Sequence, residues 1–238
     1  MNIDPQAMSS SLRRLRDAPE DQDVLVAVQG SVDACVDLFG VTGSGLMIAD
    51  EQNALRYAVA SDGRGAVLET VQTRTGEGPC VDTFVLGEVV STEDLAAEER
   101  WPASTPTLVQ HGVRSVLGIP VRLGGVTVGS LDVYLDVPHR WDDSERRALT
   151  RYGAVVEAIL AAALAARSAG ELAGQLQYAL DYRVVIERGV GYLMATERVD
   201  AVTAFNRLRR ASRGSRRKIG EVAEELLATG SLPAADRS

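Results

Sequence analysis

The 238 residues are enough to bury a full core, and this length suggests one large domain or two smaller ones. Hydrophobic residues make up 45% of the chain and charged residues 24%, as in ordinary globular proteins, so extensive disorder is not expected. The longest apolar stretch, 158–166, is far shorter than the roughly 20 residues that a membrane span needs. The arginines near the N-terminus are not followed by the apolar core of a secretory signal peptide, so the sequence predicts a cytoplasmic protein without a membrane partner.

Charge is distributed unevenly along the chain. Residues 1–170 hold 14 basic and 24 acidic side chains, net −10, whereas residues 171–230 hold 10 basic and 8 acidic, net +2. Seven positive charges and no negative ones lie within 207–218, and six of the seven are arginine. A guanidinium pairs bidentately with phosphate and stacks on unpaired bases. Since an acidic protein does not need such a cluster for solubility, the cluster indicates a nucleic-acid-binding surface.

The first two thirds of the chain have the pattern of an α+β fold. Apolar residues at helical spacing predict an amphipathic helix over 21–39. The short apolar runs 46–49 and 55–60 predict a β-hairpin across a turn at 50–53. A second hairpin is predicted from 113–123 and 126–135, because Gly124 and Gly125 between them adopt positive φ readily. Residues 63–110 read as a long irregular region of the kind that lines pockets.

From Asp142 onward the pattern is helical. A long helix with heptad spacing is predicted, and that spacing favours pairing with a partner helix; its apolar residues are Leu149, Tyr152, Val156, Ile159, Ala163 and Ala166. The register changes at 168–170, where we place a domain boundary. A second helical pattern starts at Leu172. Two shorter helices follow, one capped by Asp200 and one by Ser215, and Gly230 is the predicted stop.

The last third resembles a known RNA-binding family. The residues that carry the resemblance are Ala179, Leu180, Arg183, Ile186, Glu187, Gly191, Tyr192, Leu193, Met194, Ala204, Phe205, Leu208, Arg209, Ser212, Ile219, Val222 and Ala223. Over nearly all of 172–228 the chain is similar to an ANTAR domain, a transcription antitermination module. Val190 is a departure, because the family often has a lysine there. Together with the charge cluster, the resemblance implies that stem-loop RNA contacts Arg183, Arg207, Arg209, Arg210, Ser212, Arg213, Arg216, Arg217 and Lys218.

Residues of about 22–165 resemble a GAF domain. The resemblance rests on five short segments: 76–82, 92–95, 100–102, 112–115 and 129–131. It implies an antiparallel sheet flanked by helices, with a pocket on one face for a small-molecule ligand that the sequence does not identify. The candidate pocket residues are Gly78, Pro79, Cys80 and Trp101.

The predicted architecture therefore has four segments. A flexible N-terminus (1–20) precedes a GAF-like α+β sensor domain with its linker helix (21–167). The long coiled-coil-type helix joins this domain to an all-α three-helix ANTAR-like bundle (171–230), and a flexible tail (231–238) follows.

Neither an enzyme nor a cofactor is expected. Cys35 and Cys80 are too few for a disulfide framework and lack the spacing of a zinc site, so they are predicted to be free thiols. His111 and His139 have no clustered partners, which argues against a metal or haem role. The sequence contains no Ser-His-Asp set, phosphate-binding glycine loop or paired-carboxylate motif.

The sequence thus predicts a signal-responsive antitermination regulator that acts as a homodimer. In this hypothesis the GAF-like domain binds a small signal, the linker helix transmits a change in dimer geometry, and two ANTAR-like bundles hold paired RNA stem-loops. Two alternatives stay open. The basic helices could dock onto an acidic protein partner without touching RNA, or the GAF-like domain could be a redox or ligand-converting enzyme that uses Cys80.

Overall fold

The computed structural model describes residues 24–49, 55–166 and 171–233. The predicted flexible N-terminus, the turn at 50–53, the register change at 168–170 and most of the tail lie outside these residues. The elements in chain order are α2 (Val24–Phe39), β1 (Gly43–Ala49), β2 (Leu55–Ala60), α3 (Gly63–Thr75), α4 (Pro79–Leu86), β3 (Val90–Thr92), η1 (Leu95–Ala97), α5 (Thr105–Gln110), β4 (Ser115–Leu123), β5 (Val126–Leu135), α6 (Asp143–Ala166), α7 (Glu171–Glu197), α8 (Ala201–Ser215) and α9 (Ile219–Thr229).

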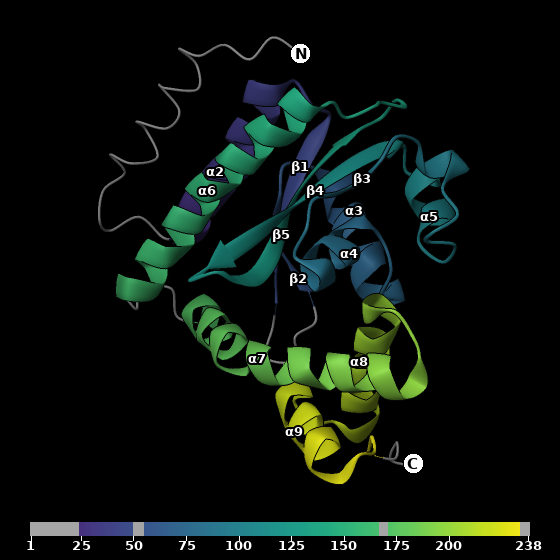
Figure 1. The fold of residues 1–238 in the computed structure, drawn as a ribbon. Helices are drawn as coiled ribbons and strands as arrows, with labels where there is room; N and C mark the ends of the chain where they lie inside the picture. Colours follow the sequence, from purple (N-terminus) through teal and green to yellow (C-terminus); the bar gives the residue numbers. More distant parts are fainter. Residues whose placement is uncertain (1–23, 50–54, 167–170, 234–238) are drawn as a thin grey trace.

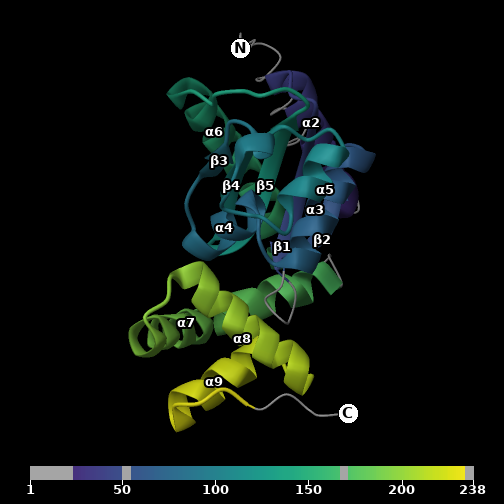
Figure 2. The same cartoon turned by 90° about the vertical axis from the view of Figure 1, so that its right-hand side faces the viewer.

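Five antiparallel strands form one sheet with the order β2-β1-β5-β4-β3. Helices α2 and α6 cover one face of the sheet, and α3 and α4 cover the other (Figure 1). Helices α7, α8 and α9 form a separate bundle against the end of this sandwich (Figure 2). The α+β fold of the first domain and the helical C-terminal domain are therefore confirmed, and so are both hairpins. No described helix is long and apolar enough to cross a membrane.

The prediction of an irregular region at 63–110 was wrong. This segment contains α3, α4, β3, η1 and α5. The glycines and prolines that suggested loops are helix ends instead: Pro79 lies in the first turn of α4, and Gly76 and Gly87 end α3 and α4 with positive φ. Helix α4 has too few turns for a clear apolar periodicity, and α3 buries Gly65, Glu69 and Gln72 among its apolar residues, so the end signals indicated loops.

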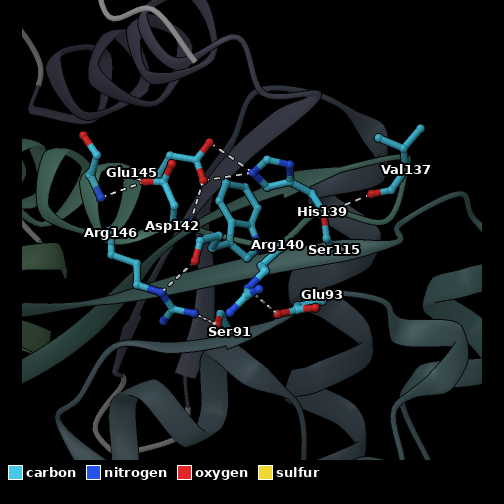
Figure 3. Close-up of polar contacts among 11 residues, drawn as sticks. Ser91, Glu93, Ser115, Val137, His139, Arg140, Asp142, Glu145 and Arg146 are labelled. Carbon is cyan, nitrogen blue, oxygen red and sulfur yellow. Dashed lines mark hydrogen bonds and ion pairs between the residues drawn. The ribbon is translucent and has the colours of Figure 1, made fainter.

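A reciprocal capping box fixes the start of α6 (Figure 3). The Asp142 carboxylate accepts hydrogen bonds from the backbone amides of Ser144 and Glu145, and Glu145 accepts one from the Asp142 amide at 2.9 Å. Glu145 also binds the His139 imidazole, 2.9 Å away, and Arg146 donates to the Ser91 hydroxyl at 2.6 Å. The loop before α6 is thereby tied both to the helix and to β3.

Replacement of Asp142 by alanine is expected to lower the free energy of unfolding by about 1 kcal/mol, because two amides of the first turn lose their acceptor. Urea denaturation followed by circular dichroism measures the change. Asp143→Ala is the control, since Asp143 is exposed and provides no cap. Equal destabilisation by both variants would contradict the capping role.

The heptad residues of α6 pack inside their own domain. Leu149, Tyr152 and Val156 are fully buried, and the Tyr152 ring meets Phe39 of α2 edge-on at 5.5 Å. The Tyr152 hydroxyl donates to the Ser31 carbonyl at 2.6 Å. The expectation that these residues face a partner helix was therefore wrong for this part of α6, because α2 and the sheet already cover them. The side chains of Ala163 and Ala166 lie outside the described part of the chain.

Helices α7, α8 and α9 form the expected three-helix bundle. Asp200 caps α8, accepting from the Thr203 amide at 2.8 Å, and Gly230 ends α9 with positive φ. Ser215 does not cap α9, contrary to the prediction: it is the last residue of α8, and Lys218 occupies the cap position. The reason is that α8 runs on to Ser215 and ends at Arg216, which adopts a left-handed conformation.

Candidate ligand site and nucleic-acid interface

Three of the four predicted pocket residues lie at the start of α4. All three residues are buried, Gly78 lies against Gln72 of α3, and the Cys80 thiol faces Asp132 of β5. Trp101 is also buried, and its indole donates to the Asp82 carboxylate of α4 at 3.0 Å. The structure therefore brings Trp101 to α4 through Asp82, whereas Gln72, Glu69 and Asp132 lie around the Cys80 thiol.

A buried polar cluster lies between α3, α4 and the sheet. The Glu69 carboxylate from α3, the Cys80 thiol from α4 and the Asp132 carboxylate from β5 have ligand atoms within 4.8 Å of one another. All three side chains are 0% exposed. Glu69 and Asp132 are not among the residues predicted from the sequence. Asp132 could have been recognised, because a charged residue in the middle of an apolar strand is rare and often belongs to a functional site.

Two further side chains orient this cluster. Gln72 donates to the Cys80 sulfur at 2.7 Å and accepts from the Cys80 amide at 2.9 Å. Ser130 donates to Asp132 Oδ1 at 2.7 Å. The positions of the thiol and of one carboxylate are thereby fixed by hydrogen bonds.

Burial sets the protonation of the cluster. Burial and the nearby Asp132 charge raise the pKa of Glu69 well above its usual range, and burial raises the pKa of Asp132 to about 7. Burial, with the charges of Asp132 and Glu69, also raises the pKa of the Cys80 thiol. The thiol is therefore protonated at neutral pH when nothing is bound, and a protonated thiol is a poor nucleophile.

Several oxygens of this region have no hydrogen-bond partner. Among the described residues of this region, both Glu69 oxygens, Asp132 Oδ2 and the Thr83 hydroxyl are buried and unsatisfied. A buried polar group without a partner is costly, and native proteins contain few of them. This concentration of four unsatisfied atoms marks the inner face of α3 and α4 as the candidate ligand site.

Three arginines of the predicted RNA-binding set are exposed on the bundle. Arg210, Arg213 and Arg216 all point into solvent near the end of α8. No ion pair to any of the three is found among the described residues. They form a compact positive surface that is available to phosphates.

Other members of the set are exposed in part and already paired within the bundle. Arg207 pairs with Glu197, and Arg217 pairs with Glu221 and Glu225. Hydrogen bonding to Glu225 raises the pKa of Arg217. Lys218 lies over the Tyr178 ring, 4.9 Å from its centre. RNA would have to compete with these contacts.

Arg183, Arg209 and Ser212 are buried, which the sequence did not predict. Ser212 donates to the Arg217 carbonyl at 2.6 Å and so closes the end of α8. Arg183 lies at the domain junction, 4.8 Å from the centre of the Phe84 ring, and donates to the Phe84 carbonyl at 3.3 Å. Arg209 lies directly against Gly76, where a Cβ atom would overlap its guanidinium. Of the expected RNA contacts Arg209 and Arg213, only Arg213 is exposed.

The junction between the two domains is formed by specific contacts. Phe84 of α4 packs edge-on against Phe205 of α8, with ring centres 6.0 Å apart. Asn206 donates to the Gly76 carbonyl at 3.0 Å. Val190, at the position where a lysine is common in ANTAR domains, lines a groove here with Val85 and Phe205. Helix α4 therefore touches the candidate ligand site at its start and the helical bundle at its end.

Comparisons with known proteins agree with this architecture. The family model described as "GAF domain" matches residues 23–160, more than half of the chain, so the protein belongs to the GAF domain family. Behind this domain, the family model described as "ANTAR domain" matches residues 174–227. The two domains stand in the predicted order, and both are regulatory rather than catalytic. The exact limits of the four predicted segments stay a prediction.

Solved structures share the fold of the first domain at low sequence identity. The GAF domain of a phosphoenolpyruvate-protein phosphotransferase from Coxiella burnetii is 17% identical, with a TM-score of 0.56, over 68% of this chain and 95% of that one. The corresponding Acinetobacter domain is 17% identical, with a TM-score of 0.55, over 69% and 96%. Free methionine-R-sulfoxide reductase from Neisseria meningitidis, in complex with its substrate, is 17% identical, with a TM-score of 0.51, over 70% and 96%. No match was found among curated proteins.

Proposed function

We propose that this protein is a signal-responsive, RNA-binding regulator of transcription antitermination. Its ANTAR domain would bind stem-loop RNA, and its GAF domain would respond to a small ligand. The observation that carries the proposal is the cluster of Arg210, Arg213 and Arg216, which is exposed and unpaired among the described residues of an otherwise acidic chain. Free guanidinium groups on a bundle that matches an RNA-binding family are suited to phosphate contacts.

The contacts at the domain junction support a mechanism for control. Arg183 and Arg209 belong to the predicted RNA-binding set, yet here they are held against α4 and Gly76 of the GAF domain. In this conformation the RNA-binding surface is incomplete. A signal that shifts α4 would release both arginines, and the equilibrium between docked and released states would set the RNA affinity. Control of this kind acts within one chain, and we propose that homodimerisation then places two bundles on paired stem-loops.

The enzymatic alternative has less support. Cys80 is fully enclosed and protonated, and Cys35 lies on α2, on the opposite face of the sheet from α4 (Figure 1). Burial raises the pKa of Cys35 to about 12. Chemistry that requires both thiols to meet would have to cross the sheet. The reductase among the similar structures therefore supports a shared fold and no shared reaction.

Titration of the purified chain with an RNA of two adjacent stem-loops tests the proposal. Saturable binding that weakens as salt increases is expected, with a log-log slope of about −0.7 for each phosphate neutralised on single-stranded loops. An acidic peptide of equal charge serves as the competitor. Displacement of RNA only by a large excess of peptide supports RNA recognition, whereas binding of the peptide alone would replace it with the protein-interaction alternative.

A further inference from the structure

We infer that Glu69, Cys80 and Asp132 form a binding site for a divalent transition-metal ion, of which Zn²⁺ is the best fit. The first reason is charge. Two fully buried carboxylates lie close together, and neither has an ion pair among the described residues. Burial of one unpaired carboxylate is costly, and a second one nearby adds repulsion, so a cation in this place would offset both costs.

The second reason is unmet coordination. Both Glu69 oxygens and Asp132 Oδ2 are buried and accept no hydrogen bond in the described part of the protein. The Thr83 hydroxyl borders the same region and is unsatisfied too. An ion would occupy the carboxylate lone pairs, and a water molecule bound to the ion could satisfy the hydroxyl.

The sheet leaves room for these groups. A Cβ at Gly45 of β1 would overlap a Glu69 carboxylate oxygen, and a Cβ at Gly118 of β4 would overlap the Thr83 hydroxyl. Ordinary strand residues at these positions would fill the region with apolar side chains and expel the carboxylate. The two glycines therefore leave space beside β1 and β4 for the polar side chains of Glu69 and Thr83.

The donor set and its spacing favour one ion over an organic ligand. Separations within 4.8 Å leave room for a single ion. Zn²⁺ binds cysteine sulfur at about 2.3 Å and carboxylate oxygen at about 2.0–2.2 Å, so the three groups need to approach by no more than about 1–1.5 Å for tetrahedral coordination. A thiolate is a poor ligand for Mg²⁺ or Ca²⁺. Three protein ligands leave a fourth position open.

The surroundings have the form of a prepared metal site. The Gln72 side-chain amide forms hydrogen bonds with the Cys80 sulfur and the Cys80 backbone amide. The Ser130 hydroxyl donates to Asp132 Oδ1, and Asp132 Oδ2 is the oxygen without a partner among the described residues. Partners of this kind orient metal ligands and raise affinity. On binding, the Cys80 thiol loses its proton to solvent and the thiolate coordinates the ion.

A metal site at this position would be the sensing site of the GAF domain. Metal binding itself does not depend on the proposed function, but its effect on RNA binding rests on it. Binding would draw α3 and the start of α4 toward β5, because the ligands come from these three elements. Since the other end of α4 carries Phe84 and Val85 at the domain junction, the same movement would alter the contacts of Arg183. The metal, or a small molecule in its open position, is then the signal.

Titration of the chelator-treated full chain with Co²⁺ and with Zn²⁺ tests the site. We expect one ion per chain, and for Co²⁺ an absorption band in the near ultraviolet that arises from charge transfer from the thiolate. Cys80→Ala should abolish the band, and Glu69→Gln and Asp132→Asn should weaken Zn²⁺ binding at least tenfold. Cys35→Ala is the matched control, because Cys35 is equally buried but lies outside the cluster. Circular dichroism verifies that each variant is folded.

Absence of saturable binding by the wild-type chain would overturn the inference, and so would a band that survives Cys80→Ala or disappears in Cys35→Ala. Equal Zn²⁺ affinity of the wild-type and isosteric Glu69→Gln chains would also overturn it, since protons alone would then neutralise the cluster. RNA binding measured on the same preparations separates the two proposals. Metal binding without RNA binding would contradict the proposed function but not the metal site. RNA binding without metal binding would contradict the metal site alone.

Discussion

Simultaneous change of Arg210, Arg213 and Arg216 to glutamate is expected to weaken RNA binding by about 100-fold or more. The three side chains are exposed, so the fold should tolerate the change, and each loses an attractive contact with phosphate and gains a repulsive one. The salt dependence should change as well, with a log-log slope that is less steep by about 2, because three phosphate contacts are lost at about 0.7 each. Fluorescence anisotropy over a salt series measures both quantities.

A variant with equal change of charge controls for the net charge. Arg147 and Arg151 are exposed on α6, and Arg140 is exposed in the loop before it, where it pairs with Glu93 at 3.6 Å; all three lie far from α8 in the sequence. Their change to glutamate shifts the net charge by the same amount and should leave the RNA affinity within about threefold at moderate salt, where distant charges are screened. Equal losses in the two triple variants would mean that the chain binds RNA only through its overall charge.

Val85→Arg is expected to release the ANTAR domain and to tighten RNA binding by about tenfold. Val85 is half-buried and lines the groove at the junction with Arg183 and Glu187, so a long charged side chain there would hold α4 and the bundle apart without emptying the core. If RNA binds tightly only to the released state, each loss of about 1.4 kcal/mol in the free energy of docking raises the RNA affinity tenfold. Distances between spin labels on α3 and α9 report the release, and anisotropy reports the affinity.

Leu86→Arg is the matched control for this prediction. Leu86 is the next residue of the same helix, but it is 47% exposed and does not line the groove at the junction. It should leave both the label distance and the RNA affinity unchanged. An increased label distance in Val85→Arg without tighter RNA binding would refute control by docking.

Elements whose structure depends on residues close together in the chain could be predicted from the sequence. The β4–β5 hairpin could be predicted because Gly124 and Gly125 specify its turn, and Asp200 could be recognised as a cap because its partner is three residues away. Helix α4 escaped prediction because it is short, and α3 because its buried face holds Gly65, Glu69 and Gln72 in place of a regular apolar stripe. Local patterns were therefore reliable only where an element had a regular apolar face or a distinctive turn.

The candidate sites depend on contacts between distant segments. Glu69 and Asp132 are 63 positions apart and meet only because β5 pairs with β1, on which α3 packs. The burial of Arg183 and Arg209 likewise depends on the GAF domain, since a charge cluster in the sequence does not reveal which members another domain covers. Sequence analysis therefore identified the exposed arginines together with the docked ones and could not separate the two groups.

Hydrogen–deuterium exchange of the full chain with and without a two-stem-loop RNA reports the binding surface and the domain junction in one experiment. RNA is expected to slow exchange over 207–218 and to speed exchange in the last turn of α4, where docking to the bundle is lost. Unchanged exchange over 207–218 at saturating RNA would contradict the proposed binding surface. Slower exchange there with α4 unaffected would contradict control by docking.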